Sequence, residues 1–484
     1  MEKLINLKTW MLITLVIGFI SCKKDAPLDT KPVAAFSVNA VELIVGNPAV
    51  FTNLSFDQNG DVKSYSWDFG DGSTSTEASP THSFAKGKYT VTLTVTDNSG
   101  NTNKNSFSKV ITVVEPSTAT TEPAKVWVFN LPGKFEDSSP AIADDGTVYI
   151  GCSAKNGLAN VFAVKNGMEV WSYATGDIVR SAPAIAENGN VYIGSYDNNL
   201  YGFTAAGSLS FKFDMGDNAK YSAPVLGSDG TIYIGSQKDK IHAVNPDGSK
   251  KWEYQTGGDV NATSAVGSDG TVFIGSTDGT FYAINQDGTL KWSSKFGSWT
   301  ATATALGADG TVYFAGEGNN IDPASGGVLI AYNPADGTEK WRVNLTQKIN
   351  QGGPSVAPDG TVYAGGADKK LVAYNPLDGS VKWVYPTNGA IQGTPAIDND
   401  GNIYVTDMEG YLYVIDADGN KKWKETQLGS KIWSSPAIDA NGVIYVAAEQ
   451  SDGTGKLFAL KTNATGLAAT GWPMRSKNAK HTGR

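Results

Sequence analysis

The sequence predicts an all-β protein whose main body is an eight-bladed β-propeller. Glycine is frequent, with 55 residues in a chain of 484, and Asp-Gly and Asn-Gly pairs recur throughout, which indicates many tight turns. From residue 126 onward one pattern repeats about every 40 residues, with several short strands in each repeat. Residues 33–115 carry alternating strands of their own, which predicts a separate β domain ahead of the propeller.

The first 21 residues are predicted to be an export signal that is not part of the fold. Lys3 and Lys8 precede a short apolar stretch, Trp10–Ile20, which is too short to span a bilayer as a stable helix. The run Phe19-Ile20-Ser21-Cys22 resembles the lipobox of bacterial lipoproteins, with Phe19 in place of the usual leucine. The resemblance implies that Cys22 is lipidated and that residues 22–32 form a tether. The alternative is an ordinary signal peptide with a chance cysteine.

Residues 33–115 contain the string WDFGDG at residues 67–72 and the period-two strand YTVTLTVT at residues 89–96. The string resembles the PKD domain, and this resemblance implies an immunoglobulin-like β-sandwich with Trp67 in its core. Asp68 and Asp71 are expected to make turn and cap hydrogen bonds rather than to bind a metal. The Pro- and Thr-rich residues 116–125 are predicted to be a linker.

Each repeat starts like Ser181-Ala182-Pro183 and ends on an aromatic outer strand. Eight copies of the first three strands occur, but the outer strand has only seven internal copies. Residues 126–129 supply the missing one, so an N-terminal strand is expected to complete the last blade and to leave no unpaired edge between the chain ends. The outer-strand aromatics, expected to be structural docking residues, are Trp127, Trp171, Phe211, Trp252, Trp292, Trp341, Trp383 and Trp423.

The strings at residues 243–252 and 283–292 resemble the tryptophan-docking motif of PQQ-like repeats. This resemblance covers residues 126–484 and implies that each tryptophan wedges between neighbouring blades. The C-terminal residues 471–484 resemble the terminal segment of such proteins, and Trp472 is expected to cover a blade.

A quinoprotein dehydrogenase is one alternative that the repeat suggests, but the chain has only two cysteines, Cys22 and Cys152, and no adjacent pair to flank a quinone. A sialidase needs three arginines around its substrate carboxylate, and the chain has four in all: Arg180, Arg342, Arg475 and Arg484. Neither a quinoprotein dehydrogenase nor a sialidase is favoured, because a likeness in fold alone says little about function. No catalytic residue and no cofactor are predicted.

Other reactive residues are scattered. The three histidines, His82, His242 and His481, do not have metal-ligand spacing. The loop at residues 398–402 partly resembles a Ca²⁺ loop but falls at the turn shared by all repeats, and Cys152 is expected to be a small buried strand residue. No metal site is therefore predicted. The net charge of −9 argues against nucleic acid as a partner.

One position in the repeat varies while its neighbours stay small. It lies where each chain segment enters its first strand, which is innermost in propellers of this type, so its side chains are expected to ring the mouth of the central channel. The predicted binding ring is Asp137, Arg180, Tyr221, Asn261, Gln351, Gln392 and Trp433, with Trp299 near the small Ala301 of the same column. The alternative is a solvated rim without a partner.

The sequence therefore favours a non-catalytic binding or scaffold module of the cell envelope, anchored to the outer membrane only through its lipid and monomeric. Its partner is expected to be an envelope protein or a polysaccharide. The propeller lipoprotein of the outer-membrane assembly machinery fits the first class but lacks a PKD domain. PKD modules beside polysaccharide-processing proteins fit the second. The alternative from another class is a propeller enzyme, either a quinoprotein dehydrogenase or a glycan-active hydrolase.

Overall fold

The computed structural model describes residues 31–38, 42–44, 48–57, 62–103, 107–114, 123–133, 136, 138–154, 160–318, 326–349, 351–423, 425–462, 464 and 466–484. The predicted export signal, Cys22, Asp137 and most of the predicted linker lie outside these residues. Within them, no helix is long and apolar enough to cross a membrane.

The N-terminal domain is a sandwich of a three-stranded and a five-stranded sheet, in the orders β1-β3-β6 and β2-β8-β7-β4-β5. Trp67 is fully buried, lies 4.9 Å from the Phe36 ring and donates its indole N–H to the Glu77 carbonyl at 2.9 Å. The immunoglobulin-like sandwich is thus confirmed. The strands are β1 (Phe36–Val38), β2 (Glu42–Ile44), β3 (Ala49–Asn53), β4 (Val62–Asp68), β5 (Thr74–Ser75), β6 (Thr81–His82), β7 (Gly87–Asp97) and β8 (Phe107–Val114).

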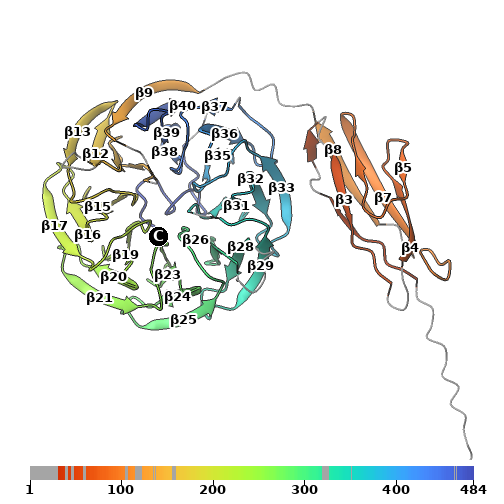
Figure 1. The fold of residues 1–484 in the computed structure, drawn as a ribbon, viewed down its shortest axis with the longest axis horizontal. Coiled ribbons are helices and arrows are strands. Elements are labelled where there is room, and N and C mark those ends of the chain that lie inside the picture. The colour runs from red at the N-terminus through yellow and green to blue at the C-terminus, as the bar shows by residue number, and fades with distance from the viewer. Residues whose placement is uncertain are drawn as a thin grey trace, which may run out of the picture. The chain divides into compact units, whose positions relative to one another are not determined.

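The rest of the chain forms eight four-stranded antiparallel sheets arranged radially around an axis (Figure 1), which confirms the eight-bladed propeller. We number the blades in chain order, each from its innermost to its outermost strand. Blades 1 to 4 are β10 (Ala141–Ile142), β11 (Val148–Gly151), β12 (Val161–Lys165), β13 (Met168–Tyr173); β14 (Ala184–Ile185), β15 (Val191–Gly194), β16 (Asn199–Phe203), β17 (Leu209–Asp214); β18 (Val225–Leu226), β19 (Ile232–Ser236), β20 (Lys240–Val244), β21 (Lys250–Gln255); and β22 (Ala265–Val266), β23 (Val272–Gly275), β24 (Thr280–Ile284), β25 (Leu290–Lys295).

The second half of the ring continues the pattern until the last blade, which takes its outermost strand from the start of the domain. Blades 5 to 8 are β26 (Ala305–Leu306), β27 (Val312–Gly316), β28 (Gly327–Tyr332), β29 (Glu339–Leu345); β30 (Ser355–Val356), β31 (Val362–Gly365), β32 (Lys370–Tyr374), β33 (Val381–Pro386); β34 (Ala396–Ile397), β35 (Ile403–Thr406), β36 (Tyr411–Ile415), β37 (Thr426–Gln427); and β38 (Ala437–Ile438), β39 (Val443–Glu449), β40 (Gly455–Lys461), with β9 (Ala124–Leu131).

Ring closure follows the predicted route. β9 pairs antiparallel with β40, and Trp127 stands opposite Ala459 just as Trp252 stands opposite Ala243 in blade 3. β9 begins at Ala124, two residues before the predicted start of the propeller at residue 126, because its register extends to the pair Ala124–Lys461. The edge of β40 is therefore paired, and the last sheet has four strands like the other blades although its strands come from the two ends of the domain.

Burial changes from the axis to the rim of each blade. The second strand is buried on both faces, as in β15, while the outer strand is partly exposed, as in β17. Because the second strand is covered on both faces, its sequence is a continuous apolar run such as Val-Tyr-Ile-Gly. The outer strands instead mix charged and aromatic residues. The core therefore lies between adjacent blades, and the connections carry the exposed side chains.

The C-terminal segment, residues 466–484, lies across the inner strands, and the C-terminus is near the centre of the ring (Figure 1). Trp472, only 2% exposed, pairs with Val356 of blade 6. Arg475 and His481 are also buried, and their side chains bond to Thr263 and to the Pro183 carbonyl. This segment thus covers one end of the axis.

Candidate functional site

The outer-strand aromatics contact the next blade in the same way. Trp341 donates its indole N–H to the Pro376 carbonyl of blade 6 at 2.8 Å, and its ring lies over Gly379 in the turn of that blade. Five tryptophans donate such a hydrogen bond, and the ring of Phe211 covers the equivalent Gly248 without one. The donors are Trp171, Trp252, Trp292, Trp341 and Trp383.

Trp423 has a different environment. It follows β36 outside the short outer strand β37 and packs against the core shared by blades 7, 8 and 1. Trp423 belongs to blade 7, which is next to blade 8. The outer strand of blade 8, β9, comes from the start of the domain, so β40 and β9 are not joined by a hairpin turn. The turn glycine that the other aromatics contact is therefore missing at this position. Trp127 on β9 does lie over a turn glycine, Gly167 of blade 1.

The predicted ring lies at the entrances to the inner strands, at the opposite end of these strands from their 1–2 turns. Neighbouring entrances touch: a Cβ on Gly352 would meet the Gln392 carbonyl at 2.8 Å, and Thr263 bridges Ala303 in parallel. Asn261 and Gln392 are 1% and 7% exposed. The other described members are half-buried, namely Arg180, Tyr221, Trp299, Gln351 and Trp433.

Four uncharged members of the ring carry a buried polar atom that has no hydrogen-bond partner among the described residues. These are Asn261 Oδ1, Gln351 Oε1, Gln392 Oε1 and Trp433 Nε1. A buried polar group without a partner costs about 1–3 kcal/mol, so these atoms favour a hydrogen-bonding partner from outside the chain, either a ligand or water. All four belong to blades 4 to 8, where the ring is uncharged. This arc combines acceptors with one donor and suits a ligand that offers both.

The ring is charged and aromatic on blades 1 to 3. Arg180 forms an ion pair with Glu136, and its guanidinium lies 5.4 Å from the Tyr196 ring and 6.0 Å from the Tyr221 ring. Lys220 adds a second cation 5.3 Å from the Tyr221 ring. Glu136 and Tyr196 were not in the predicted ring, because neither stands at the variable position of the repeat. Glu136 and Tyr196 reach Arg180 because their loops lie next to the loop that carries Arg180.

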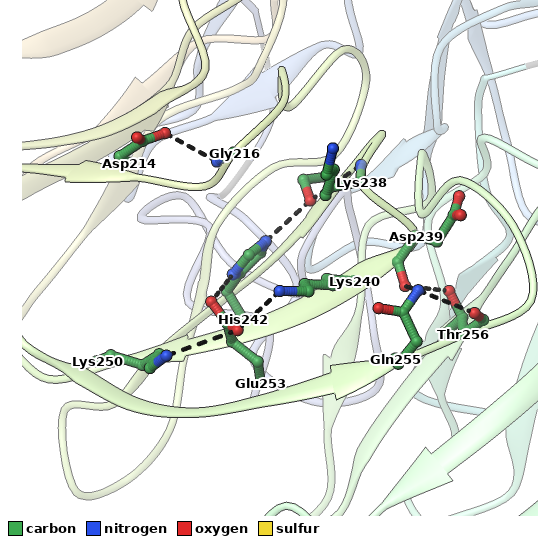
Figure 2. A network of polar contacts seen from close by, with 11 residues as sticks. Asp214, Gly216, Lys238, Asp239, Lys240, His242, Lys250, Glu253, Gln255 and Thr256 are labelled. Carbon is green, nitrogen blue, oxygen red and sulfur yellow. Dashed lines mark hydrogen bonds and ion pairs between the residues drawn. The ribbon is translucent and has the colours of Figure 1, made fainter.

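Figure 2 shows a second polar cluster, around His242 on β20. The Ser236 hydroxyl is 2.8 Å from His242 Nε2, and Glu253 Oε1 is 3.3 Å from His242 Nδ1. Lys240 and Lys250 pair with the same carboxylate. Burial lowers the pKa of His242 to about 4, against the pull of Glu253, so its imidazole is neutral at neutral pH.

This cluster has the connectivity of a serine–histidine–acid triad but not the access that catalysis requires. Ser236 and His242 are both 0% exposed, so neither can reach a substrate carbonyl. The Nδ1 contact also lacks hydrogen-bond geometry. Serines at the same position in blades 2 and 4, Ser195 and Ser276, bond to backbone carbonyls instead. The cluster therefore holds a turn in place.

The remaining residues singled out in the sequence have structural roles within their own turns and strands. Asp68 and Asp71 accept from the backbone N–H groups of Gly70 and Ser73, as turn caps do. The first carboxylate of the 398–402 loop, Asp398, accepts from backbone N–H groups of its own turn. Cys152 is buried, which raises the pKa of its thiol to about 11. The described residues contain no group of three or more histidine, cysteine or acidic side chains that could hold a metal.

Two family models match the chain. One, described as PKD domain, matches residues 29–113. The other, described as Outer membrane protein assembly factor BamB, matches residues 115–266, 207–326 and 325–466 in overlapping segments. The second covers most of the chain, and both agree with the resemblances found in the sequence.

The curated relatives match over short stretches only. The pre-pro-metalloprotease PrtV of Vibrio cholerae is 42% identical over 84 residues, which is 17% of this chain and 9% of that protein. The microbial collagenase of Vibrio alginolyticus is 33% identical over 120 residues, 24% of this chain and 15% of that protein. The chain thus spans less than a fifth of the length of these relatives.

Solved structures resemble the propeller in fold. BamB from Moraxella catarrhalis has a TM-score of 0.55 at 17% identity and covers 70% of this chain and 100% of its own. The designed Ika8 protein has a TM-score of 0.55 at 14% identity, with 69% and 99% covered. A europium-containing methanol dehydrogenase has a TM-score of 0.54 at 12% identity, with 72% and 95% covered. An assembly factor, a designed protein and an enzyme share this fold, so it does not decide function.

Proposed function

Because the chain belongs to the family of the outer membrane protein assembly factor BamB and carries a PKD domain ahead of its propeller, we propose that it is a non-catalytic binding module of the cell envelope. Its partner is another envelope protein, held at the ring of inner-strand entrances. Cys22 anchors the chain to the outer membrane through its lipid, as the lipobox-like run suggests.

The observation that carries this proposal is the arc of buried polar atoms without partners at Asn261, Gln351, Gln392 and Trp433. A peptide backbone offers both N–H donors and C=O acceptors, which is what this mixed arc lacks. Trp433 in this arc and Trp299 of the same ring are half-buried and can cover the apolar parts of a bound segment. Polysaccharide hydroxyls have the same hydrogen-bonding capacity, so a glycan is the competing outcome of the test.

A quinone cofactor does not fit the residues present. Such a site needs a metal bound by clustered side chains beside the quinone, and the described residues contain no such cluster. Side chains of the C-terminal segment also fill space along the axis. Arg475 donates to the Thr263 hydroxyl at 3.0 Å and to the Tyr221 carbonyl of the ring at 3.5 Å, and His481 bonds to the Pro183 carbonyl. The described residues therefore do not form a quinone site.

The test removes three of the four unpartnered atoms, by changes of similar side-chain size at the two glutamines and by replacing the Trp433 indole with the smaller phenyl ring. In the triple variant Gln351→Met, Gln392→Met and Trp433→Phe, we expect an unchanged or slightly higher melting temperature but at least a tenfold loss of partner capture from the protein's own envelope. The control variant Tyr233→Phe removes a buried, unpartnered hydroxyl between blades 3 and 4 and is expected to leave capture unchanged.

Capture is read by mass spectrometry after pull-down, in parallel with a glycan array. If the triple variant retains the same protein partners as the wild type, the ring is not the binding site. If the wild type binds array glycans and the triple variant does not, the site is right and the partner class is wrong. For the anchor, Cys22→Ser is expected to release the chain from the membrane fraction, and retention there would contradict lipidation.

A further inference from the structure

The C-terminal segment uses one repeated contact with the inner strands. In each case a tail carbonyl accepts a hydrogen bond from the second residue of an inner strand, whose N–H points toward the axis. Six blades donate in this way, at distances of 2.7–2.9 Å. The pairs are Ile142 with Ala479, Ile185 with Lys480, Leu226 with Thr482, Val266 with Gly483, Val356 with Trp472 and Ile397 with Pro473.

The two blades that the tail leaves out are 5 and 8. Their equivalent residues, Leu306 and Ile438, find no acceptor for these N–H groups in the part of the chain that the structure describes. Each lines a cavity between the turns and the tail. The cavity at Leu306 measures about 830 Å³, and the one at Ile438 about 520 Å³. Each of the two N–H groups without an acceptor therefore lies beside a cavity.

The cavity of blade 5 has an uncommitted positive charge. Its two carboxylates already have partners: Asp269 is 2.9 Å from Lys291, and Asp309 is 3.2 Å from Lys340. Arg484 pairs with Glu187 at 2.7 Å. Lys477 has no ion pair with any described residue and lies 5.8 Å from the Trp472 ring in the cavity wall.

The environment of Lys477 favours an anion beside it. Burial lowers the pKa of Lys477, and the nearby Arg484 lowers it further, because an ammonium that is poorly solvated and close to another cation holds its proton less tightly. In the smaller cavity the matching cation, Lys480, is already 2.6 Å from Asp144. Of these two cavities, the one at blade 5 combines a backbone donor and an ammonium that both have no partner among the described residues.

We propose that this cavity binds an extended acidic peptide segment of another protein, with a peptide carbonyl accepting from the Leu306 N–H and an aspartate or glutamate side chain pairing with Lys477. The segment would fill the place that tail residues fill on blades 4 and 6. Its apolar side chains would pack on Leu306, Pro334 and Ala335, which line the cavity. The residues that line this cavity include none of the ring residues, and the proposal does not rest on the ring.

The test uses fluorescein-labelled nonapeptides of alternating threonine and valine, with aspartate, asparagine or lysine at the centre, titrated into the full chain by fluorescence anisotropy. We expect the aspartate peptide to bind about tenfold more tightly than the asparagine peptide, and the lysine peptide to bind most weakly. Lys477→Met is expected to remove the preference for aspartate. Its matched control, Lys480→Met at the other cavity, is expected to keep it.

Hydrogen exchange locates the bound peptide. We expect slower exchange of the Leu306 amide in the complex and no change at Ile438. Equal affinity for the three peptides, no binding of any of them, or protection at Ile438 alone would each overturn the proposal. The Trp299→Ala and Trp433→Ala double variant is expected to bind the aspartate peptide normally, so that a failure of the ring proposal remains distinguishable from a failure of this one.

Discussion

Single turn glycines decide whether neighbouring blades can approach each other. Gly337 in blade 5 has a φ of +73°, and a Cβ there would meet the Trp292 ring at 2.4 Å. Gly453 has a similar φ of +82° but nothing within 4 Å of the position of its Cβ. The two positions therefore share a backbone cost and differ only in the contact with the indole.

We predict that Gly453→Ala destabilises the protein by about 1 kcal/mol, the cost of a left-handed conformation for an L-residue. Gly337→Ala adds a clash with a packed ring, and we expect it to cost about 2 kcal/mol more. Urea denaturation followed by tryptophan fluorescence compares the two variants. Equal losses would mean that the Trp292 contact with Gly337 does not stabilise the pairing of blades 4 and 5.

His242 makes the stability of the propeller depend on acidity. Its pKa in the folded chain is lowered to about 4, mainly by burial, whereas the unfolded value is 6.5. Between these values the unfolded chain binds a proton that the folded chain does not bind. Stability is therefore lost as the pH falls from about 6.5 to 4, by about 3 kcal/mol in total.

The variant His242→Val, with the residue found at the equivalent position 372, is expected to lose less stability over this pH range than the wild type. The other titrating groups, including the buried His481, are common to both chains, so the difference isolates His242. Melting temperatures measured at half-unit steps from pH 7.5 to 4 provide the comparison. Parallel curves would show that His242 does not titrate in this way.

At the scale of elements, the features that could be predicted from the sequence are those that recur in every repeat. The number of blades and the strand that closes the ring follow from counting copies, because each copy must build the same sheet. The strand β37 is an exception, since its blade lacks the usual hairpin geometry around Trp423 and pairs only Thr426 and Gln427 with β36. Repeat alignment cannot detect this shift, because the aromatic residue is still present at its usual spacing.

Contacts that occur in one place and do not recur from blade to blade could not be predicted from the sequence. Glu136 and Tyr196 approach Arg180 only because two loops meet, and the course of the tail follows no repeated pattern. The variable column did locate the ring. It could not show which of its side chains lack partners, since that depends on atoms from neighbouring blades, as for Gln392.

Strand β9 supplies a prediction at the same scale. A chain that begins at residue 132 lacks β9 and leaves β40 as an unpaired edge, which is a template for association. We expect this chain to self-associate and to melt at a lower temperature, whereas a chain that begins at residue 116 remains monomeric. A synthetic peptide of residues 123–131 is expected to restore the monomer, as judged by light scattering after size exclusion. No rescue by the peptide would argue against closure through β9.

For the whole molecule, the tail fastens the inner ends of the blades to one another across the axis. It bonds to blades 1, 2, 3, 4, 6 and 7, which are separated by up to 255 residues along the chain, from Ile142 to Ile397. A single segment of residues 466–484 thus couples sheets that otherwise contact only their neighbours.

Ending the chain after Gly466 should therefore act on six blades and not on the other two. We predict that amide exchange accelerates at Ile142, Ile185, Leu226, Val266, Val356 and Ile397, which lose their acceptors, and changes little at Leu306 and Ile438, whose N–H groups have no tail acceptor in the intact chain. Hydrogen exchange read by mass spectrometry at single-residue level gives this pattern directly. Uniform acceleration in all eight blades would mean instead that the tail stabilises the ring globally, through Trp472 packing, and not through the individual bonds.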